Sequence, residues 1–226
     1  MNQSWIRLIF VFALLTVSAC RSSNARSYSF PPEWFQAVER KGAPDWEILP
    51  QEARPGEVIL SKRNELGILS NFAATPFVYE GKSYASVEGF WQMMKYPEGE
   101  GDERLKDAMV QWAFTREQVA QMTAFAAKRA GDQAEANMKR LGIQWVTFNG
   151  KKILYRENTQ GEFYKLILAA EWAKLEQNPK VREVLLRTGD LVLRPDHHQT
   201  PDSAPAWKYN EIWMKIRSDL STSQPH

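Results

Sequence analysis

The residues best suited to chemistry lie between positions 70 and 96, which read SNFAATPFVYEGKSYASVEGFWQMMKY. This stretch places one carboxylate, Glu88, among the aromatic side chains of Tyr84, Phe90 and Trp91. Crowding by these rings would remove water from the carboxylate and raise its pKa toward neutrality, where a general acid or base works best. Glu88 is therefore the candidate catalytic residue of the chain.

The surrounding residues predict the elements that position this carboxylate. Residues 77–84 contain a Glu-Gly turn between two short β-type runs, which indicates a hairpin. Ser86 is a suitable N-cap for the helix that follows, so Glu88 would lie in the first turn, where the helix dipole stabilises a carboxylate and opposes the effect of burial. Gln92 and Lys95 come four and seven residues after Glu88 and are expected on the same helix face.

The 226-residue chain is 43% hydrophobic and 25% charged, which supplies apolar material for one domain of ordinary size. Helical patterns outweigh strand patterns and do not alternate with them regularly, which favours a mainly helical single domain of the α+β class with small hairpins. The expected strands cover 57–60, 77–79, 82–84 and 191–193, a second hairpin lies within 145–155, and the expected helices cover 102–112, 115–141, 163–175, 181–187 and 209–220.

The first nineteen residues have the layout of a secretory signal, with a positive charge at Arg7 and an apolar run over 8–17. That run is about ten residues long, whereas a helix needs roughly twenty to span a bilayer. Residues 17–20 read VSAC and resemble a bacterial lipobox, in which Cys20 would become the lipidated first residue. A plain signal peptide that ends near a cysteine is the alternative. We expect an exported lipoprotein, anchored to a bacterial membrane and facing the periplasm or the cell exterior.

The sequence therefore divides into four segments. Residues 1–19 form the signal peptide, and residues 20–45 hold the lipidated cysteine, a polar tether and a short docking helix after Pro31-Pro32. The compact domain is expected to cover 46–220, and 221–226 form a tail.

Charge and aromatic content restrict the class of partner. The formal net charge is only +2, and no basic stripe is visible, so nucleic acid is not expected as a partner. Nine Trp and eleven Phe indicate either a thick core or a pocket that stacks on flat rings, and burial in the core is the commoner use of such residues.

Three motifs in the first half of the chain carry a family resemblance. SNF at 70–72, the hairpin pattern PF–Y–GK–Y and the helical pattern S–E–FWQ–MK together resemble the NADAR family, which includes YbiA-like proteins. The later stretch AKLEQNPKVREVLLRTGD is similar to the family's late helical pair, so the resemblance covers about 57–220. It implies a YbiA-like α+β fold.

The resemblance also implies a function, which is hydrolysis of a ribosyl C–N bond by an N-glycosidase that needs no cofactor. Glu88 would then act as the acid/base or water-activating carboxylate, while Asn71 and Phe72 would shape the pocket, and Gln92 and Lys95 would bind hydroxyls or phosphate. The ligand would be a nucleotide, an ADP-ribose derivative or a riboflavin-precursor-like compound. The expected substrate-binding set is Ser70, Asn71, Phe72, Tyr84, Trp91, Gln92, Lys95, Asp196, His197, His198, Asp202 and Trp207.

The C-terminal part departs from the family pattern. Relatives carry an Asp and a Trp-Gly pair before a glycine-rich stretch, whereas this chain reads LRPDHHQTPDSAPAWKYNEIW. Asp202 and Trp207 would be displaced counterparts. His197 and His198 are adjacent, so on an extended segment they would point to opposite sides and at most one would face the pocket. Asp196 and Asp202 with these histidines match no standard metal-ligand spacing, so no metal is expected.

Two alternative functions remain open at the level of sequence. The missing glycine-rich stretch is compatible with an inactive module that still binds NAD or ADP-ribose. The Asp-His-His sequence at 196–198 is compatible with a metal-dependent phosphoesterase.

Overall fold

The structure, a computed structural model, describes residues 29–222 and has the α+β class that the sequence predicts. The predicted signal peptide, Cys20, most of the tether and the end of the tail lie outside these residues. The helices are α1 (Val87–Met93), α2 (Arg116–Ala120), α3 (Ala124–Arg140), α4 (Glu162–Gln177), α5 (Pro179–Arg187) and α6 (Tyr209–Thr222). The strands are β1 (Glu57–Ile59), β2 (Phe77–Tyr79), β3 (Lys82–Tyr84), β4 (Trp145–Phe148), β5 (Lys151–Leu154) and β6 (Val192–Arg194). None of the helices in this range is long and apolar enough to cross a membrane.

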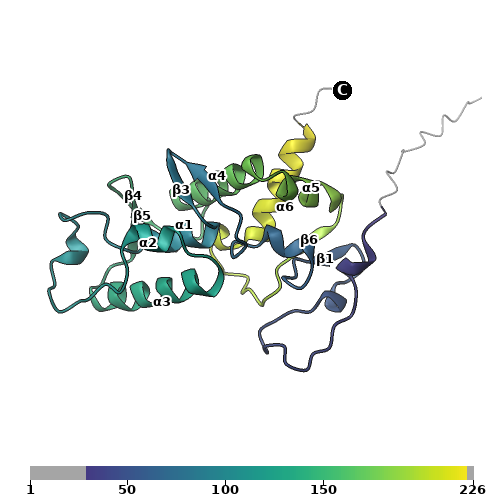
Figure 1. Cartoon of the computed structure of the whole chain (residues 1–226), viewed down its shortest axis with the longest axis horizontal. Helices are drawn as coiled ribbons and strands as arrows, with labels where there is room; N and C mark the ends of the chain where they lie inside the picture. Colours follow the sequence, from purple (N-terminus) through teal and green to yellow (C-terminus); the bar gives the residue numbers. More distant parts are fainter. Residues whose placement is uncertain (1–28, 223–226) are drawn as a thin grey trace, which may run out of the picture.

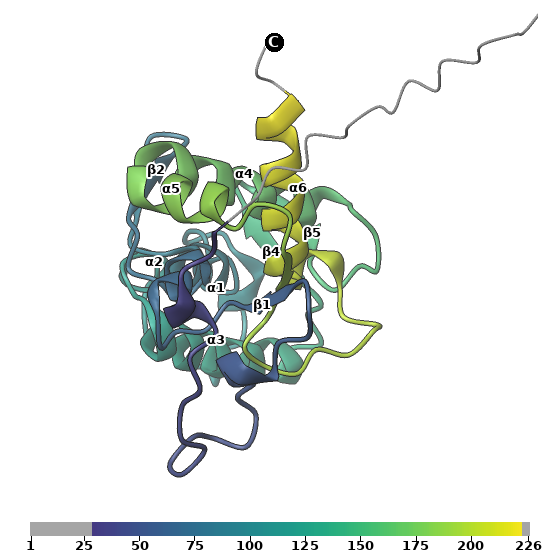
Figure 2. The same ribbon diagram turned by 90° about the vertical axis from the view of Figure 1, so that its right-hand side faces the viewer.

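The strands pair two by two. Strands β2 and β3, and β4 and β5, form the two predicted antiparallel hairpins, and the second turns through Asn149 and Gly150, both at positive φ. Strands β1 and β6 pair in parallel, with Glu57 opposite Val192. This last pairing joins segments from near the two ends of the domain, and Figure 1 shows the two strands side by side at the right of its view, while Figure 2 shows β1 near the centre of the molecule.

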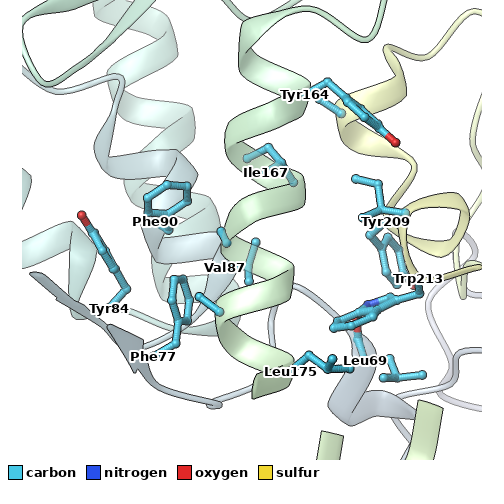
Figure 3. Packing of buried hydrophobic residues seen from close by; sticks show 14 of the residues in the cluster. Leu69, Phe77, Tyr84, Val87, Phe90, Tyr164, Ile167, Leu175, Tyr209 and Trp213 are labelled. Carbon is cyan, nitrogen blue, oxygen red and sulfur yellow. The ribbon is translucent and has the colours of Figure 1, made fainter. Parts of the chain in front are cut away.

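Helix α4 runs through the centre of the hydrophobic core. In Figure 3 the side chains of Phe77, Tyr84, Val87 and Phe90 lie on one side of this helix, and Leu69, Tyr209 and Trp213 lie on the other. All seven are at most 4% exposed. The burial of so many large rings provides the main stabilising free energy and fixes α1 and α6 relative to α4.

The region predicted as one helix over 115–141 is divided between α2 and α3. The carbonyl groups near the break are used by the elements of the α1 region: Ala85 N donates to Ala120 O at 3.0 Å, and Ser86 Oγ donates to Met122 O at 2.8 Å. Gly89 on α1 packs so closely here that an added Cβ would lie 2.5 Å from Met122 O. Tertiary contacts thus replace the helical hydrogen bonds that an uninterrupted helix would have made.

Two predicted helices are reduced to short 3₁₀ turns. Over 31–42 only Pro32–Trp34 is helical, because the side chain of Gln51 pairs with both the N–H and the C=O of Val38. Over 102–112 only Glu103–Leu105 is helical, because Arg104 turns inward and donates to the carbonyls of Met94 and Lys95 at 2.9 Å.

The packed part of the chain begins before the predicted start of the domain at residue 46. Trp34 is fully buried in the core, and its Nε1 donates to Glu65 Oε1 at 2.9 Å. The docking segment therefore belongs to the packed structure, where it buries the Trp34 indole in the core and pairs Val38 with Gln51.

Candidate active site

A cavity of about 600 Å³ lies between α1, α3, α4 and the segment that precedes α6. Nine of the thirteen residues proposed for catalysis or substrate binding line it, although they come from segments more than a hundred residues apart. These nine are Ser70, Asn71, Phe72, Glu88, Trp91, Lys95, His197, His198 and Trp207.

Glu88 is held in the first turn of α1, as its N-cap predicts. The Ser86 hydroxyl accepts a hydrogen bond from Gly89 N at 2.9 Å, and Glu88 N donates to Asn71 O at the same distance. The carboxylate is only 4% exposed. Trp91 Nε1 donates to Oε2 at 2.9 Å, and Gln92 Nε2 donates to Oε1 at 2.8 Å.

Burial is the largest influence on the pKa of Glu88. It raises the pKa of the carboxyl, and the hydrogen bonds from Gln92 and Trp91, together with the charge of Lys95, only partly offset this effect. The sequence left open whether burial or the N-terminal position would dominate. Burial is the largest influence on this carboxyl in the structure, so the pKa of Glu88 lies above that of an exposed carboxyl, which is the direction that suits a group that exchanges protons.

Lys95 lies on the cavity wall two turns after Glu88 but is paired with a different carboxylate. Its Nζ is 2.9 Å from Glu135 Oε2 on α3 and 4.6 Å from the centre of the Trp91 ring. Burial lowers the pKa of Lys95, although Glu135 opposes this change. The ammonium is therefore fixed in place by Glu135, an acid that no sequence motif marks.

Glu135 collects several donors at the cavity wall. Both of its oxygens lie 2.9 Å from the Tyr155 hydroxyl, and Arg156 pairs with Oε1. Burial alone would raise the pKa of Glu135, but the hydrogen bonds and charges of Lys95, with Tyr155 and Arg156, lower it to about 2. The cavity thus holds two carboxyl groups with opposite pKa shifts, and Glu135 is the one that stays ionised.

Two buried side chains, one on α4 and one on α6, hold the loop that carries Ser70, Asn71 and Phe72. Lys174 Nζ donates to Ser70 O at 2.9 Å, and Trp213 Nε1 donates to Leu69 O at 2.6 Å. Within the described residues, Asn71 Oδ1 and Trp207 Nε1 are buried atoms without a hydrogen-bond partner. Both residues line the cavity, so an acceptor and a donor are available there for a bound ligand.

The Asp-His-His segment contributes more than was expected, because both histidines line the cavity. The expectation that at most one would do so was wrong, since the segment forms only a single bridge, between Glu47 and His197, and is not a regular strand. Asp196 is buried behind it, where its oxygens contact Lys62 Nζ at 2.5 Å and His197 Nδ1 at 3.1 Å. Asp196 therefore orients cavity residues without lining the cavity.

Three other proposed binding residues also lie outside the cavity wall. Tyr84 packs between Phe77 and Phe90 on the far side of α1, where burial raises its pKa to about 12. Asp202 is exposed in a turn. Gln92 is buried behind Glu88, which it contacts in place of a ligand. These three residues were expected to bind substrate, but in the structure they do not line the cavity.

Several cavity residues carried no motif by which the sequence could identify them. They come from the chain before and after β1, from α3, from the residues that follow β5 and from α4, and only packing brings them to Glu88. They include Trp46, Lys62, Phe125, Lys128, Asp132, Glu135, Tyr155, Arg156 and Phe163.

No group of three or more His, Cys, Asp or Glu side chains placed to hold a metal ion occurs among residues 29–222. The phosphoesterase alternative thus has no ligand set in this part of the chain.

Comparison with known proteins gives one similar structure. The sequence matches no family model and no curated protein. The NMR structure of the E. coli protein YbiA is similar over 74% of this chain and 86% of that chain, with 20% sequence identity and a TM-score of 0.45. A likeness at this level says nothing about activity or ligand.

Proposed function

We propose that this protein is an N-glycosidase that hydrolyses a ribosyl C–N bond of a nucleotide, an ADP-ribose derivative or a riboflavin-precursor-like compound. The observation that carries the proposal is Glu88, a buried carboxyl with a raised pKa on the wall of a cavity that also presents aromatic rings and cations. Cleavage of such a bond develops positive charge on the sugar, which a nearby carboxylate stabilises.

The proposed reaction is balanced by one water molecule. The bond between the anomeric carbon and the base nitrogen breaks, and the water oxygen bonds to that carbon. Glu88 accepts the proton that the water loses and then delivers it to the departing nitrogen, which returns Glu88 to its ionised form. In this reaction Glu88 needs a pKa near the working pH, which its burial favours.

The rest of the wall fits the remaining parts of such a substrate. Trp91 and Phe163 meet edge to face with ring centres 6.3 Å apart and offer a surface for a flat base. Lys95, Lys128 and Arg156 supply positive charge for phosphate, and the ionised Glu135 offers acceptors for ribose hydroxyls.

The test is release of a free base. The purified protein and its Glu88→Gln variant would be incubated with NAD, ADP-ribosylated guanosine and phosphorylated ribosylaminopyrimidines, and the products followed by liquid chromatography and mass spectrometry. Glu117→Gln, a change at an exposed acid on α2, is the matched control. The proposal requires that only Glu88→Gln stops base release.

One observation favours the alternative of an inactive binding module. Both oxygens of Glu88 already accept hydrogen bonds from residues of their own helix, which a purely structural carboxylate would also do. In that case wild type and Glu88→Gln would bind ligand with equal affinity, and neither would release a base.

We also propose that Cys20 anchors the protein to a membrane, because it is the single cysteine and follows an apolar segment in a lipobox-like sequence. Expression in a bacterial host with labelled fatty acid tests this assignment. The wild-type chain would carry label, and Cys20→Ser would not.

A further inference from the structure

A second cavity, of about 380 Å³, lies between α2 and the ends of the two hairpins. Its walls come from β3, from the turn between β4 and β5, from the last turn of α1 and from α2. The described residues that line it are all different from those that line the cavity around Glu88. Small-molecule sites have volumes from roughly 300 Å³ upward, so this one is large enough for a small ligand. We call it the hairpin cavity.

The hydroxyl of Tyr84 is an unused hydrogen-bond donor at the hairpin cavity. Tyr84 lines this cavity and is 2% exposed, and within residues 29–222 its hydroxyl oxygen is buried without a hydrogen-bond partner. In Figure 3 the hydroxyl points away from α4, while the ring packs against Phe77 and Phe90. Burial raises the pKa of Tyr84 to about 12, so the hydroxyl keeps its proton at neutral pH. A ligand with an acceptor would satisfy this buried donor.

Apolar side chains surround the Tyr84 ring in the hairpin cavity. Met93, Ala120 and Phe148 line it, and each is at most 7% exposed. The Phe90 ring meets Tyr84 at a centroid distance of 4.8 Å and Phe148 at 5.6 Å, so one buried ring holds both aromatic walls in place. Two aromatic rings and a thioether form a surface that suits a flat ring.

The charges at the hairpin cavity balance one another. Arg116 and Glu98 are already paired, with Nη2 3.5 Å from Oε1. Lys82 and Glu117 are exposed at the edge of the cavity and have opposite signs. The cavity therefore has no excess charge with which to attract an ion, and an apolar interior favours an uncharged ligand over a charged one.

We propose that the hairpin cavity is a second ligand site, which binds an uncharged compound with a flat ring and a hydrogen-bond acceptor. The ring lies against Met93 and Phe148, and the acceptor receives a hydrogen bond from the Tyr84 hydroxyl. This site is separate from the proposed glycosidase site and does not depend on that activity. Met93 and Glu88 belong to the same seven-residue helix, so a ligand here contacts the element that positions the carboxyl.

Methyl NMR spectroscopy of the full-length protein tests this proposal. None of the methionines in residues 29–222 lines the cavity around Glu88, so the Met93 methyl signal, identified by its loss in Met93→Leu, reports on the hairpin cavity. Benzamide has a flat ring and a carbonyl acceptor, and it should shift this signal saturably. Tyr84→Phe should weaken benzamide binding by roughly fivefold. Toluene has no such acceptor and should bind wild type and Tyr84→Phe alike.

A second variant and a matched control complete the experiment. Ala120→Leu would fill the cavity and should abolish the shift. Tyr164→Phe is the control, because Tyr164 is a buried tyrosine on α4 that lines neither cavity. Tyr84→Phe removes a donor that has no partner, so its urea midpoint should not fall below that of wild type, which separates a binding role from a structural one.

Three results would each overturn the proposal. The first is that benzamide causes no saturable shift of the Met93 signal. The second is that Tyr84→Phe binds benzamide as tightly as Tyr164→Phe does, or that the shift survives in Ala120→Leu. The third is a lower urea midpoint in Tyr84→Phe, because the hydroxyl would then already have a partner in the folded protein.

Discussion

Gly131 on α3 lies directly against the side-chain amide of Gln92 on α1. A Cβ added at position 131 would lie 1.5 Å from Gln92 Oε1 and 2.1 Å from its Cδ. The same amide donates to Glu88 Oε1 at 2.8 Å, and Gly131 O accepts a hydrogen bond from Lys95 at 3.4 Å. One glycine thus lets α3 approach α1 closely enough to orient both the carboxyl and the ammonium of the cavity.

Gly131→Ala should therefore damage the site more than the helix. Alanine favours a helix interior, but the new methyl group must displace the buried Gln92 amide from Glu88, at a cost of about 1–3 kcal/mol in unfolding free energy. We expect base release to fall about tenfold or more. Gly101→Ala, where an added Cβ meets nothing within 4 Å, is the control. Normal activity in Gly131→Ala would show that the Gln92 contact does not matter.

Trp91→Phe should move the pH dependence of activity. It keeps a ring against Phe163 but removes the Nε1 donor that lies 2.9 Å from Glu88 Oε2. That hydrogen bond favours the ionised carboxylate, so its loss should raise the pKa of Glu88 further. The limb of the pH profile of kcat/KM that reports the ionisation of Glu88 should therefore shift to higher pH. Trp112→Phe alters an indole away from the cavity and should leave the pH profile unchanged. An unchanged profile in Trp91→Phe would mean that Glu88 takes no part in the reaction.

Glu171 should make the fold less stable as the pH rises toward neutrality. It is fully buried on α4, with Oε2 3.8 Å from Lys174 Nζ, and burial raises its pKa from 4.5 to about 7 despite that partner. Between these two values the folded protein keeps a proton that the unfolded chain has released. The free energy of unfolding contributed by this group therefore falls from pH 4.5 to about 7, by at most about 3 kcal/mol, and is constant above that range.

Urea unfolding at pH 5, 6, 7 and 8 measures this dependence. Glu171→Gln has no titrating group at the position, so its stability should decline less than that of wild type over the same range. Glu176→Gln, at an exposed position of the same helix, is the control and should follow wild type. Parallel curves for all three proteins would mean that Glu171 is ionised throughout.

Gly89→Ala should lower stability without any change of charge. The new Cβ would lie 2.5 Å from Met122 O and 2.9 Å from Val119 O, which are backbone atoms that cannot rotate away. We expect α1 to separate from α2 and the free energy of unfolding to fall by about 1–3 kcal/mol. The measurement is the urea midpoint, again against Gly101→Ala, and an unchanged midpoint would contradict the close packing of the two helices.

Local sequence signals were enough to predict the hairpin over 77–84, the Ser86 cap and the place of Glu88 in the first turn of its helix. Turn and capping residues act through hydrogen bonds to backbone groups a few positions away, so these elements are readable locally. The turn signal at Asn149 and Gly150 likewise located the second hairpin, and the helical patterns of the sequence located α4 to α6.

The tertiary structure selected the side chains that meet around Glu88. It paired Lys95 with Glu135, turned Tyr84 into the core, placed Gln92 behind the carboxylate and brought Trp46 beside Phe125. The division of α2 from α3 and the pairing of β1 with β6 had no local signal either. These outcomes depend on long-range packing, in which burial and close approach between distant segments outweigh the preferences of each segment alone.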